Sequence, residues 1–270
     1  MVCGDTPAMN VRLMGVVNVT PDSFSDGGLY LEPEAAIAHG SELADEGADI
    51  LDVGGESTRP GAEEVSVEVE VARTEPVVAD LAALGHKVSI DTSKRAVAEA
   101  ALDAGAAIVN DVTAMRADPE IGALCADRGA ELALMHMQGT PRTMQDEPTY
   151  EDVVDDVKGF LAERIEAALA AGVAEERIWV DPGIGFGKTL EHNLELLRRL
   201  GELRDLGRPI LVGTSRKSFI GKVDGSGADE RIGGTIASSV LAVAAGADVL
   251  RVHDVAEAVQ ATRVAAAILG

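Results

Sequence analysis

A helix-like stretch, a Gly-Ala pair and a short apolar run follow one another four times in this chain. The pairs begin at Gly47, Gly105, Gly129 and Gly246. Glycine is favoured just past a helix C-terminus because it accepts the left-handed backbone conformation at no steric cost. An apolar run of about five residues is typical of a buried parallel strand. The repeated unit therefore predicts helices that alternate with buried strands.

Extending this pattern along the chain predicts eight strands, at residues 12–18, 49–53, 87–91, 107–110, 131–136, 177–180, 209–213 and 248–252. The helical stretches between them include 33–46, 66–84, 94–104, 149–171, 190–206, 229–245 and 254–269. Eight such units favour an α/β fold of the closed (β/α)8 TIM-barrel type. An open doubly wound sheet is the alternative, but no G-x-G-x-x-G follows the first strand. Since no linker divides the chain, we expect residues 1–270 to form one domain.

The charge of the chain limits its partners. It carries 46 acidic and 23 basic residues, a formal net charge of −23. Such a surface opposes binding to nucleic acid or to an anionic membrane. The acidity is either an ordinary solvated surface or an adaptation to a high-salt cytoplasm, where ions screen self-repulsion. The scarcity of lysine, 6 residues against 17 arginines, favours a halophilic protein.

The sequence also indicates a cytoplasmic location. No apolar run reaches the roughly 18 residues that span a bilayer, and the N-terminus lacks the pattern of a signal peptide. The two cysteines, Cys3 and Cys125, form neither a disulfide framework nor a metal-binding spacing. We therefore expect a reducing compartment.

Polar side chains follow all eight predicted strands, and in a parallel barrel these strand ends meet at the rim that carries the active site. Taken alone, several have structural explanations. Thr92 or Ser93 could cap the next helix, His136 could be a satisfied core histidine, and Lys188 could be a solvated surface charge. Because the polar residues of all eight strand ends converge at one rim, a functional role is the better explanation for them. They include Asn18, Asp91, Asn110, Asp181, Lys217, Arg251 and His253.

Residue types narrow the chemistry. Asp91, Asn110 and Asp181 offer acceptors and an amide that suit a flat, polar heterocycle. Asn18 could help to hold a hydrated Mg2+ beside a diphosphate, because Mg2+ prefers oxygen ligands and keeps several waters. The rim lacks a Ser-His-Asp arrangement and a cysteine nucleophile. It gathers positive charge that suits phosphate or carboxylate groups, from Arg59, Arg216, Lys217, Arg251 and His253.

These motifs resemble those of the dihydropteroate synthase family over nearly the whole chain. Residues 18–28 resemble the family's first signature and residues 55–61 its second, while 181–188, 215–218 and 251–254 complete the set. The resemblance implies a barrel enzyme of folate synthesis that sulfonamides inhibit. Such an enzyme condenses (7,8-dihydropterin-6-yl)methyl diphosphate with 4-aminobenzoate to 7,8-dihydropteroate and diphosphate. Family members form homodimers, which we expect here too.

The resemblance also implies residue roles. Asp91, Lys217 and Arg251 would be catalytic, with Asp91 steadying the positive charge that develops on the pterin methylene, and Asn18 would bind Mg2+. The pterin diphosphate would be held by Thr58, Asp91, Asn110, Asp181, Lys217, Arg251 and His253. The aminobenzoate pocket would be formed by Phe24, Arg59, Pro60, Phe186 and Ser218.

Three other functions compete with this interpretation. A pterin-binding methyltransferase barrel would explain Asp91, Asn110 and Asp181 but not the loops that follow strands 1 and 2. A pterin-binding protein without catalysis would not need charged residues at every expected position. A Schiff-base aldolase could use Lys217, although that lysine lies in a loop beside Arg216.

Overall fold

The computed structural model describes residues 11–20, 33–57, 64–140 and 143–269. Within them lie the strands β1 (Arg12–Asn18), β2 (Ile50–Gly54), β3 (Val88–Asp91), β4 (Ile108–Asp111), β5 (Glu131–Met135), β6 (Ile178–Asp181), β7 (Leu211–Val212) and β8 (Val249–Val252). Hydrogen bonding orders them β6-β5-β4-β3-β2-β1-β8-β7, all parallel. A parallel bridge between Val180 and Ile210 joins the two ends of that order. The sheet closes into a barrel, and the predicted (β/α)8 fold is confirmed.

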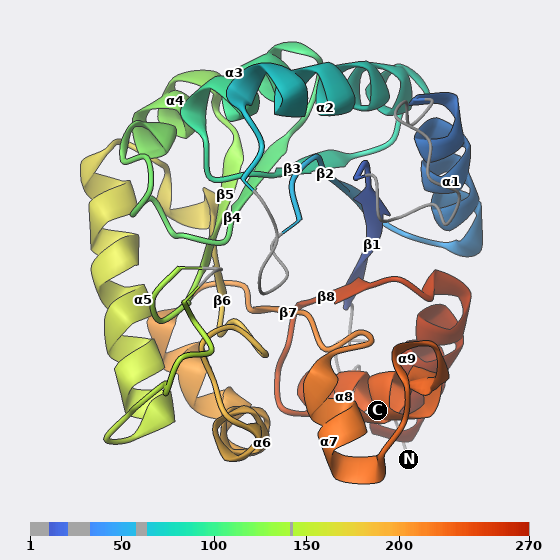
Figure 1. Ribbon diagram of the computed structural model, residues 1–270, viewed down its shortest axis with the longest axis vertical. Helices are drawn as coiled ribbons and strands as arrows, with labels where there is room; N and C mark the ends of the chain where they lie inside the picture. Colours follow the sequence, from blue (N-terminus) through green and yellow to red (C-terminus); the bar gives the residue numbers. More distant parts are fainter. Residues whose placement is uncertain (1–10, 21–32, 58–63, 141–142, 270) are drawn as a thin grey trace, which may run out of the picture.

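The helices form a ring outside the strands (Figure 1). They are α1 (Pro33–Glu46), α2 (Val67–Ala83), α3 (Arg95–Asp103), α4 (Glu120–Arg128), α5 (Val153–Ala170), α6 (Leu190–Arg198), α7 (Ser218–Asp224), α8 (Ile232–Ala244) and α9 (Val255–Leu269). Three 3-10 helices, η2 (Glu175–Arg177), η3 (Leu200–Leu206) and η4 (Ala228–Glu230), complete the described elements. The main apolar core fills the space between strands and helices, with Leu81, Ile90 and Leu132 fully buried in it. No described helix is long and apolar enough to cross a membrane.

The repeated Gly-Ala pair ends four helices in the same way. Each glycine has a positive φ, between 61° at Gly129 and 113° at Gly47. At the first pair, Gly47 N donates to Ala44 O and Ala48 N donates to Leu43 O, the two bonds of a Schellman motif. Equivalent bonds end α3, α4 and α8. The motif turns the chain from helix to strand, which explains why the pattern could be recognised in the sequence.

The strand predictions agree with the structure to within about two residues, as expected for boundaries set by pattern alone. The helix predictions differ from the structure in three places. The helix expected over 190–206 is divided into α6 and η3, and α8 begins at Ile232 rather than at 229. The helix expected from 149 begins at Val153, because the side chain of Asp152 accepts hydrogen bonds from the backbone N–H groups of Val154 and Asp155 and so fixes the first turn there.

The barrel interior contains a separate apolar cluster, formed by Met14, Ile50, Ile108, Ala133, Trp179, Leu211 and Val249. Arg12 covers it at the amino ends of the strands, where its guanidinium carbon lies 4.4 Å from the centre of the Trp179 ring. Strand side chains alternate between the two faces of a sheet. The residues two positions further along each strand must therefore point into the barrel at its carboxyl end, directly above this cluster.

Candidate functional site

A layer of polar side chains lies above the apolar cluster and follows from that alternation. Asp52 is two residues after Ile50, Asn110 two after Ile108, Asp181 two after Trp179 and Arg251 two after Val249. Asn110 and Asp181 are buried, and Asp52 is completely so. A pocket opens above this layer at the carboxyl ends of the strands. Its lining includes Asp91, Asn110, Asp181, Phe186, Lys217, Arg251 and His253.

Arg251 is the centre of this layer. Its Nε donates to Asp52 Oδ2 at 2.6 Å, and its Nη2 donates to Asp91 Oδ2 at 2.8 Å. Asp52 Oδ2 also accepts a hydrogen bond from Asn110 Nδ2 at 3.1 Å. Burial opposes the charge of Arg251, but the carboxylates of Asp52 and Asp91 outweigh it and hold the pKa of Arg251 above its usual value. The arginine therefore remains a fixed cation that links β8 to β2 and β3.

Burial moves the other pocket groups toward neutrality. It raises the pKa of Asp91 to about 7, against the opposing effect of Arg251. It raises the pKa of Asp181 to about 6, although Asp181 Oδ1 accepts a hydrogen bond from Gly183 N at 2.7 Å. Burial and the nearby Arg251 lower the pKa of Lys217 to about 8. The ammonium of Lys217 lies 4.0 Å from the centre of the Phe186 ring, a cation–π contact.

Two expected positive charges do not act as such in the pocket. Burial, followed by the field of Arg251, lowers the pKa of His253 to about 3, so His253 is neutral near pH 7. Its Nδ1 lies 2.9 Å from Ser215 Oγ. Arg216 is exposed and forms an ion pair with Asp254 instead of lining the pocket. The positive charge of the described lining therefore comes from Arg251 and Lys217.

The loop after β6 is held by a buried lysine. Lys188 is only 1% exposed, so its interpretation as a solvated surface charge is wrong. Its Nζ lies 2.9 Å from Gly183 O, Phe186 O and His136 Nδ1. His136 is a buried core histidine that packs edge-on against Phe160 at 4.9 Å. Because Lys188 binds the carbonyl group of Phe186, it holds the backbone of the residue whose ring forms one wall of the pocket.

Gly183 shows how closely that loop approaches β5. Its φ is +66°, and a Cβ atom built on it would lie 1.9 Å from His136 O. Only glycine combines this backbone conformation with this contact. The turn of this loop runs from Gly183 to Phe186, where Phe186 N donates to Gly183 O, and Asp181 before it still lines the pocket.

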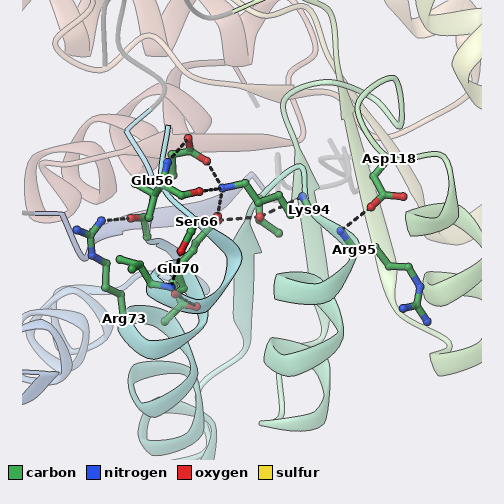
Figure 2. A network of polar contacts seen from close by, with 12 residues as sticks. Glu56, Ser66, Glu70, Arg73, Lys94, Arg95 and Asp118 are labelled. Carbon is green, nitrogen blue, oxygen red and sulfur yellow. Dashed lines mark hydrogen bonds and ion pairs between the residues drawn. The ribbon is translucent and has the colours of Figure 1, made fainter. Parts of the chain in front are cut away.

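A second lysine, partly buried, supports the ends of β2 and β3. Figure 2 shows Lys94 between Glu56 and Glu70, with its Nζ 2.7 Å from a carboxylate oxygen of each. The same Nζ donates to Val65 O at 2.5 Å. Burial lowers the pKa of Lys94, but its bonds to Glu56 and Glu70 outweigh that effect and raise it. Lys94 thus joins residues on both sides of the segment 57–64 to the exit of β3.

Thr92 belongs to this network and does not cap α3. Its hydroxyl group donates to Glu70 Oε1 at 2.8 Å. The N-cap position of α3 is Lys94, whose side chain makes no capping bond. Instead, Asp118 Oδ2 accepts from Arg95 N at 3.1 Å, as Figure 2 shows. A residue 23 positions away in sequence supplies the cap, which sequence pattern alone does not reveal.

The structure brings together most, but not all, of the predicted site residues. Asn18 ends β1 beside Gly54, where a Cβ built on the glycine would lie 3.9 Å from Asn18 Oδ1 and 3.5 Å from Asp91 Cβ. Ser218 is exposed at the first residue of α7 and is not part of the pocket lining. Phe24, Thr58, Arg59 and Pro60 lie outside the described residues. Asp52 is not among the predicted site residues, although an acid between Leu51 and Val53, in an otherwise apolar strand, is a detectable signal.

The described residues contain no group of three or more His, Cys, Asp or Glu side chains that could hold a metal ion. Mg2+ does not need such a group when substrate phosphates and water supply most of its oxygen ligands. Asn18 offers a half-buried amide at the rim beside Asp91. The residues present therefore fit a hydrated Mg2+ that reaches the site together with a diphosphate.

The Lys94 network predicts a loss of stability when its cation is removed. Lys94→Met leaves the carboxylate of Glu70, whose side chain is 1% exposed, without its ion-pair partner. We expect a loss of about 3 kcal/mol in the free energy of unfolding, measured in urea. Lys87→Met is the matched control, because Lys87 pairs with Glu131 near the surface, and it should lose less than about 1 kcal/mol. Equal losses in the two variants would contradict the importance of the buried network.

Comparisons with known proteins agree with this geometry. The family described as pterin binding enzyme matches residues 14–253. A dihydropteroate synthase of Neisseria meningitidis serogroup B is 48% identical over 259 residues, covering 94% of this chain and 91% of the relative. The structure of Xanthomonas albilineans dihydropteroate synthase with 4-aminobenzoic acid is 49% identical, with a TM-score of 0.91 and coverage of 97% and 94%. Its complex with 7,8-dihydropteroate gives a TM-score of 0.88 at 46% identity, with the same coverage. The chain therefore belongs to the pterin binding enzyme family and, within it, to the dihydropteroate synthases.

Proposed function

We propose that the pocket at the carboxyl ends of the strands holds the pterin of (7,8-dihydropterin-6-yl)methyl diphosphate during dihydropteroate synthesis. The observation that carries this assignment is that Asp91, Asn110, Asp181, Lys217 and Arg251 line a single pocket. Carboxylates and an amide can match the N–H groups and ring nitrogens of a pterin, and the lysine can donate to its carbonyl oxygen. As a dihydropteroate synthase, the enzyme joins this pterin to 4-aminobenzoate and releases diphosphate.

The charges in the pocket suit a bond that ionises. When the methylene–oxygen bond breaks, positive charge develops on the pterin methylene and negative charge on the leaving diphosphate. Fixed charges aimed at both lower the barrier. The carboxylate of Asp91 stabilises the developing positive charge. Arg251, held in place by Asp52 and Asp91, stabilises the negative charge of the leaving group. His253, neutral and bonded to Ser215, can donate a hydrogen bond to a phosphate oxygen through its other ring nitrogen.

The proposal for the aromatic amine and the metal extends to the rim. Phe186, whose ring forms an aromatic wall beside Lys217, supports an assignment to 4-aminobenzoate. Ser218, the exposed first residue of α7, is assigned to the same substrate from its motif. Phe24, Arg59 and Pro60 are assigned to the same subsite, and Thr58 to the diphosphate, from their motifs alone. Asn18 would hold Mg2+, which, when bound, neutralises charge on the diphosphate oxygens.

A coupled assay tests this function. With the pterin diphosphate, Mg2+ and 4-aminobenzoate, we expect equal amounts of 7,8-dihydropteroate and diphosphate. Asn18→Ala should weaken the dependence on Mg2+, and Asp91→Ala should lower kcat by about a hundredfold or more. Lys222→Ala, which changes an exposed residue of α7, is the control and should leave the Mg2+ dependence and kcat unchanged. Diphosphate release without dihydropteroate would assign the pocket to another acceptor, and a Mg2+-independent enzyme would reject the role of Asn18.

The altered pKa values predict a narrow pH optimum. Asp91 and Asp181, with pKa values of about 7 and 6, lose their charge as the pH falls, and Lys217, with a pKa of about 8, loses its charge as the pH rises. A pH profile of kcat/KM should therefore peak between about 7 and 8 and fall on both sides. Lys217→Arg should move the alkaline limb upward, because a guanidinium keeps its proton. An alkaline limb that does not move in this variant would belong to another group.

We also propose that the enzyme is a cytoplasmic homodimer adapted to high salt. The exposed apolar side chains on α8 and α9 support the dimer: Leu241 is 65% exposed, Val264 54% and Ile268 77%. These two helices pack against each other, so the side chains can contribute to one apolar surface. The net charge of −23 and the low lysine content support the adaptation to salt.

Measurements in solution across a KCl series test both parts. Light scattering should give twice the chain mass of 28.0 kDa, and Leu241→Glu should give a monomer, because a charge in an apolar interface is costly. The melting temperature of both proteins should rise from dilute buffer to molar KCl, since salt screens repulsion among the acidic residues. A wild-type monomer would reject the dimer. Equal stability in dilute buffer and in KCl would reject the adaptation to salt.

A further inference from the structure

Asp52 is a buried carboxylate that also contacts Asn110, and none of the residue roles assigned above explains that contact. It lies in the middle of β2, completely buried, with Val16 and Ser89 as its neighbours in register. Its Oδ2 accepts from Arg251 Nε at 2.6 Å and from Asn110 Nδ2 at 3.1 Å. Asp52 thus contacts two residues that line the pocket, while it is not itself part of the lining.

The hydrogen bond between Asp52 and Asn110 determines the orientation of the Asn110 amide. An asparagine amide can occupy two orientations that exchange its oxygen and its nitrogen. Opposite an ionised carboxylate only the NH2 group is favourable, because two oxygens would repel each other. One N–H of Asn110 is therefore given to Asp52. The second N–H and Oδ1 then present one donor and one acceptor in fixed positions to a ligand.

The contact with Arg251 fixes a second donor. A guanidinium is planar and offers its N–H groups in a rigid fork. With Nε bound to Asp52 and Nη2 bound to Asp91, the plane of the group is determined from two strands. Among the described residues no acceptor takes a hydrogen from Nη1. Within the described part of the chain, the hydrogens of this nitrogen are therefore left for a ligand of the pocket.

The contacts of Asp52 are not those expected of a residue that serves only the stability of the fold. Its Oδ1 is buried and accepts no hydrogen bond from the described residues, although buried carboxylate oxygens are nearly always paired. A buried ion pair is weak evidence for stability in any case, because desolvation offsets its Coulombic attraction. A function in the pocket accounts for keeping the charge at this position.

We propose that Asp52 is the positioning residue of the pterin subsite: it selects one amide orientation of Asn110 and one guanidinium orientation of Arg251, and so determines where the pocket donates and where it accepts. The inference rests on the proposed assignment of the pterin to this pocket. It predicts that the negative charge of Asp52, and not only its volume, sets the affinity for the heterocycle.

The test uses Asp52→Asn in the full chain, because this change keeps the shape and removes the charge. The new amide can offer oxygen or nitrogen to its neighbours, so the orientation of Asn110 is no longer determined. We expect kcat/KM for the pterin diphosphate to fall about tenfold to a hundredfold, as for other groups that orient a ligand-binding residue, mainly through KM. Calorimetric titration with 7,8-dihydropteroate should show a matching loss of affinity, independently of turnover.

A double-mutant cycle shows whether Asp52 acts through Asn110. If it does, Asp52→Asn should cost much less in an Asn110→Ala background than in the wild type. Asp111→Asn is the matched control, because the buried carboxylate of Asp111 bonds, among the described residues, only within its own turn, to Thr113 and Met115. It should lower the melting temperature and leave KM unchanged. Asp52→Ser, followed by circular dichroism, provides a second variant if Asp52→Asn does not fold.

The outcomes separate this inference from the assignment of the pocket. An unchanged KM and affinity in Asn110→Ala would reject the pterin subsite itself. A raised KM in Asn110→Ala together with an unchanged KM in Asp52→Asn would overturn the inference alone. Independent, multiplicative effects in the cycle would also overturn it, because a positioning residue acts through the group that it orients.

Discussion

The closed ring of parallel strands is the constraint on which the rest of this structure depends. Because all eight strands run in one direction, their carboxyl ends meet at one rim, and the period of two in each strand points alternate side chains inward. Two inner layers therefore follow one another. Ile50 and Ile108 lie in the first, and Asp52 and Asn110 lie in the second. An apolar layer closes the barrel below, and a polar layer lies directly above it. The pocket is a consequence of strand direction and register before any loop contributes.

The electrostatics of the pocket differ from those of the surface. The protein as a whole is strongly acidic, yet Arg251 and Lys217 stand among the carboxylates of the polar layer. Burial raises the pKa of acids and lowers that of lysine, because it disfavours either charged form. Asp91, Asp181 and Lys217 are thereby brought near neutrality, while Arg251 remains charged between two carboxylates. Such a site can respond to charge that develops on a substrate without large rearrangement.

Two lysines outside the polar layer hold the loops around it. Lys188 binds the carbonyl groups of the β6 loop, and Lys94 joins Glu56 and Glu70 at the ends of β2 and β3. In both cases several acceptors surround one ammonium group in a confined space, where the loss of the cation leaves buried acceptors unpaired. Neither lysine needs to touch substrate to matter for activity. Both act by keeping a strand exit in place.

The sequence by itself determined the barrel, the order of its elements and the identity of the rim. Gly-Ala pairs at helix ends and apolar runs are local signals, and local hydrogen bonds, such as those of Gly47 and Ala48, produce them. Its motifs also named Asp91 and Arg251, because polar residues at strand ends stand out against apolar strands. Only the tertiary structure decided that Lys188 is buried, that Arg216 is turned to Asp254, and that Asp52 joins Asn110 to Arg251. The physical reason is that burial and ion pairing depend on residues up to 199 positions apart, whose proximity arises only when the barrel closes.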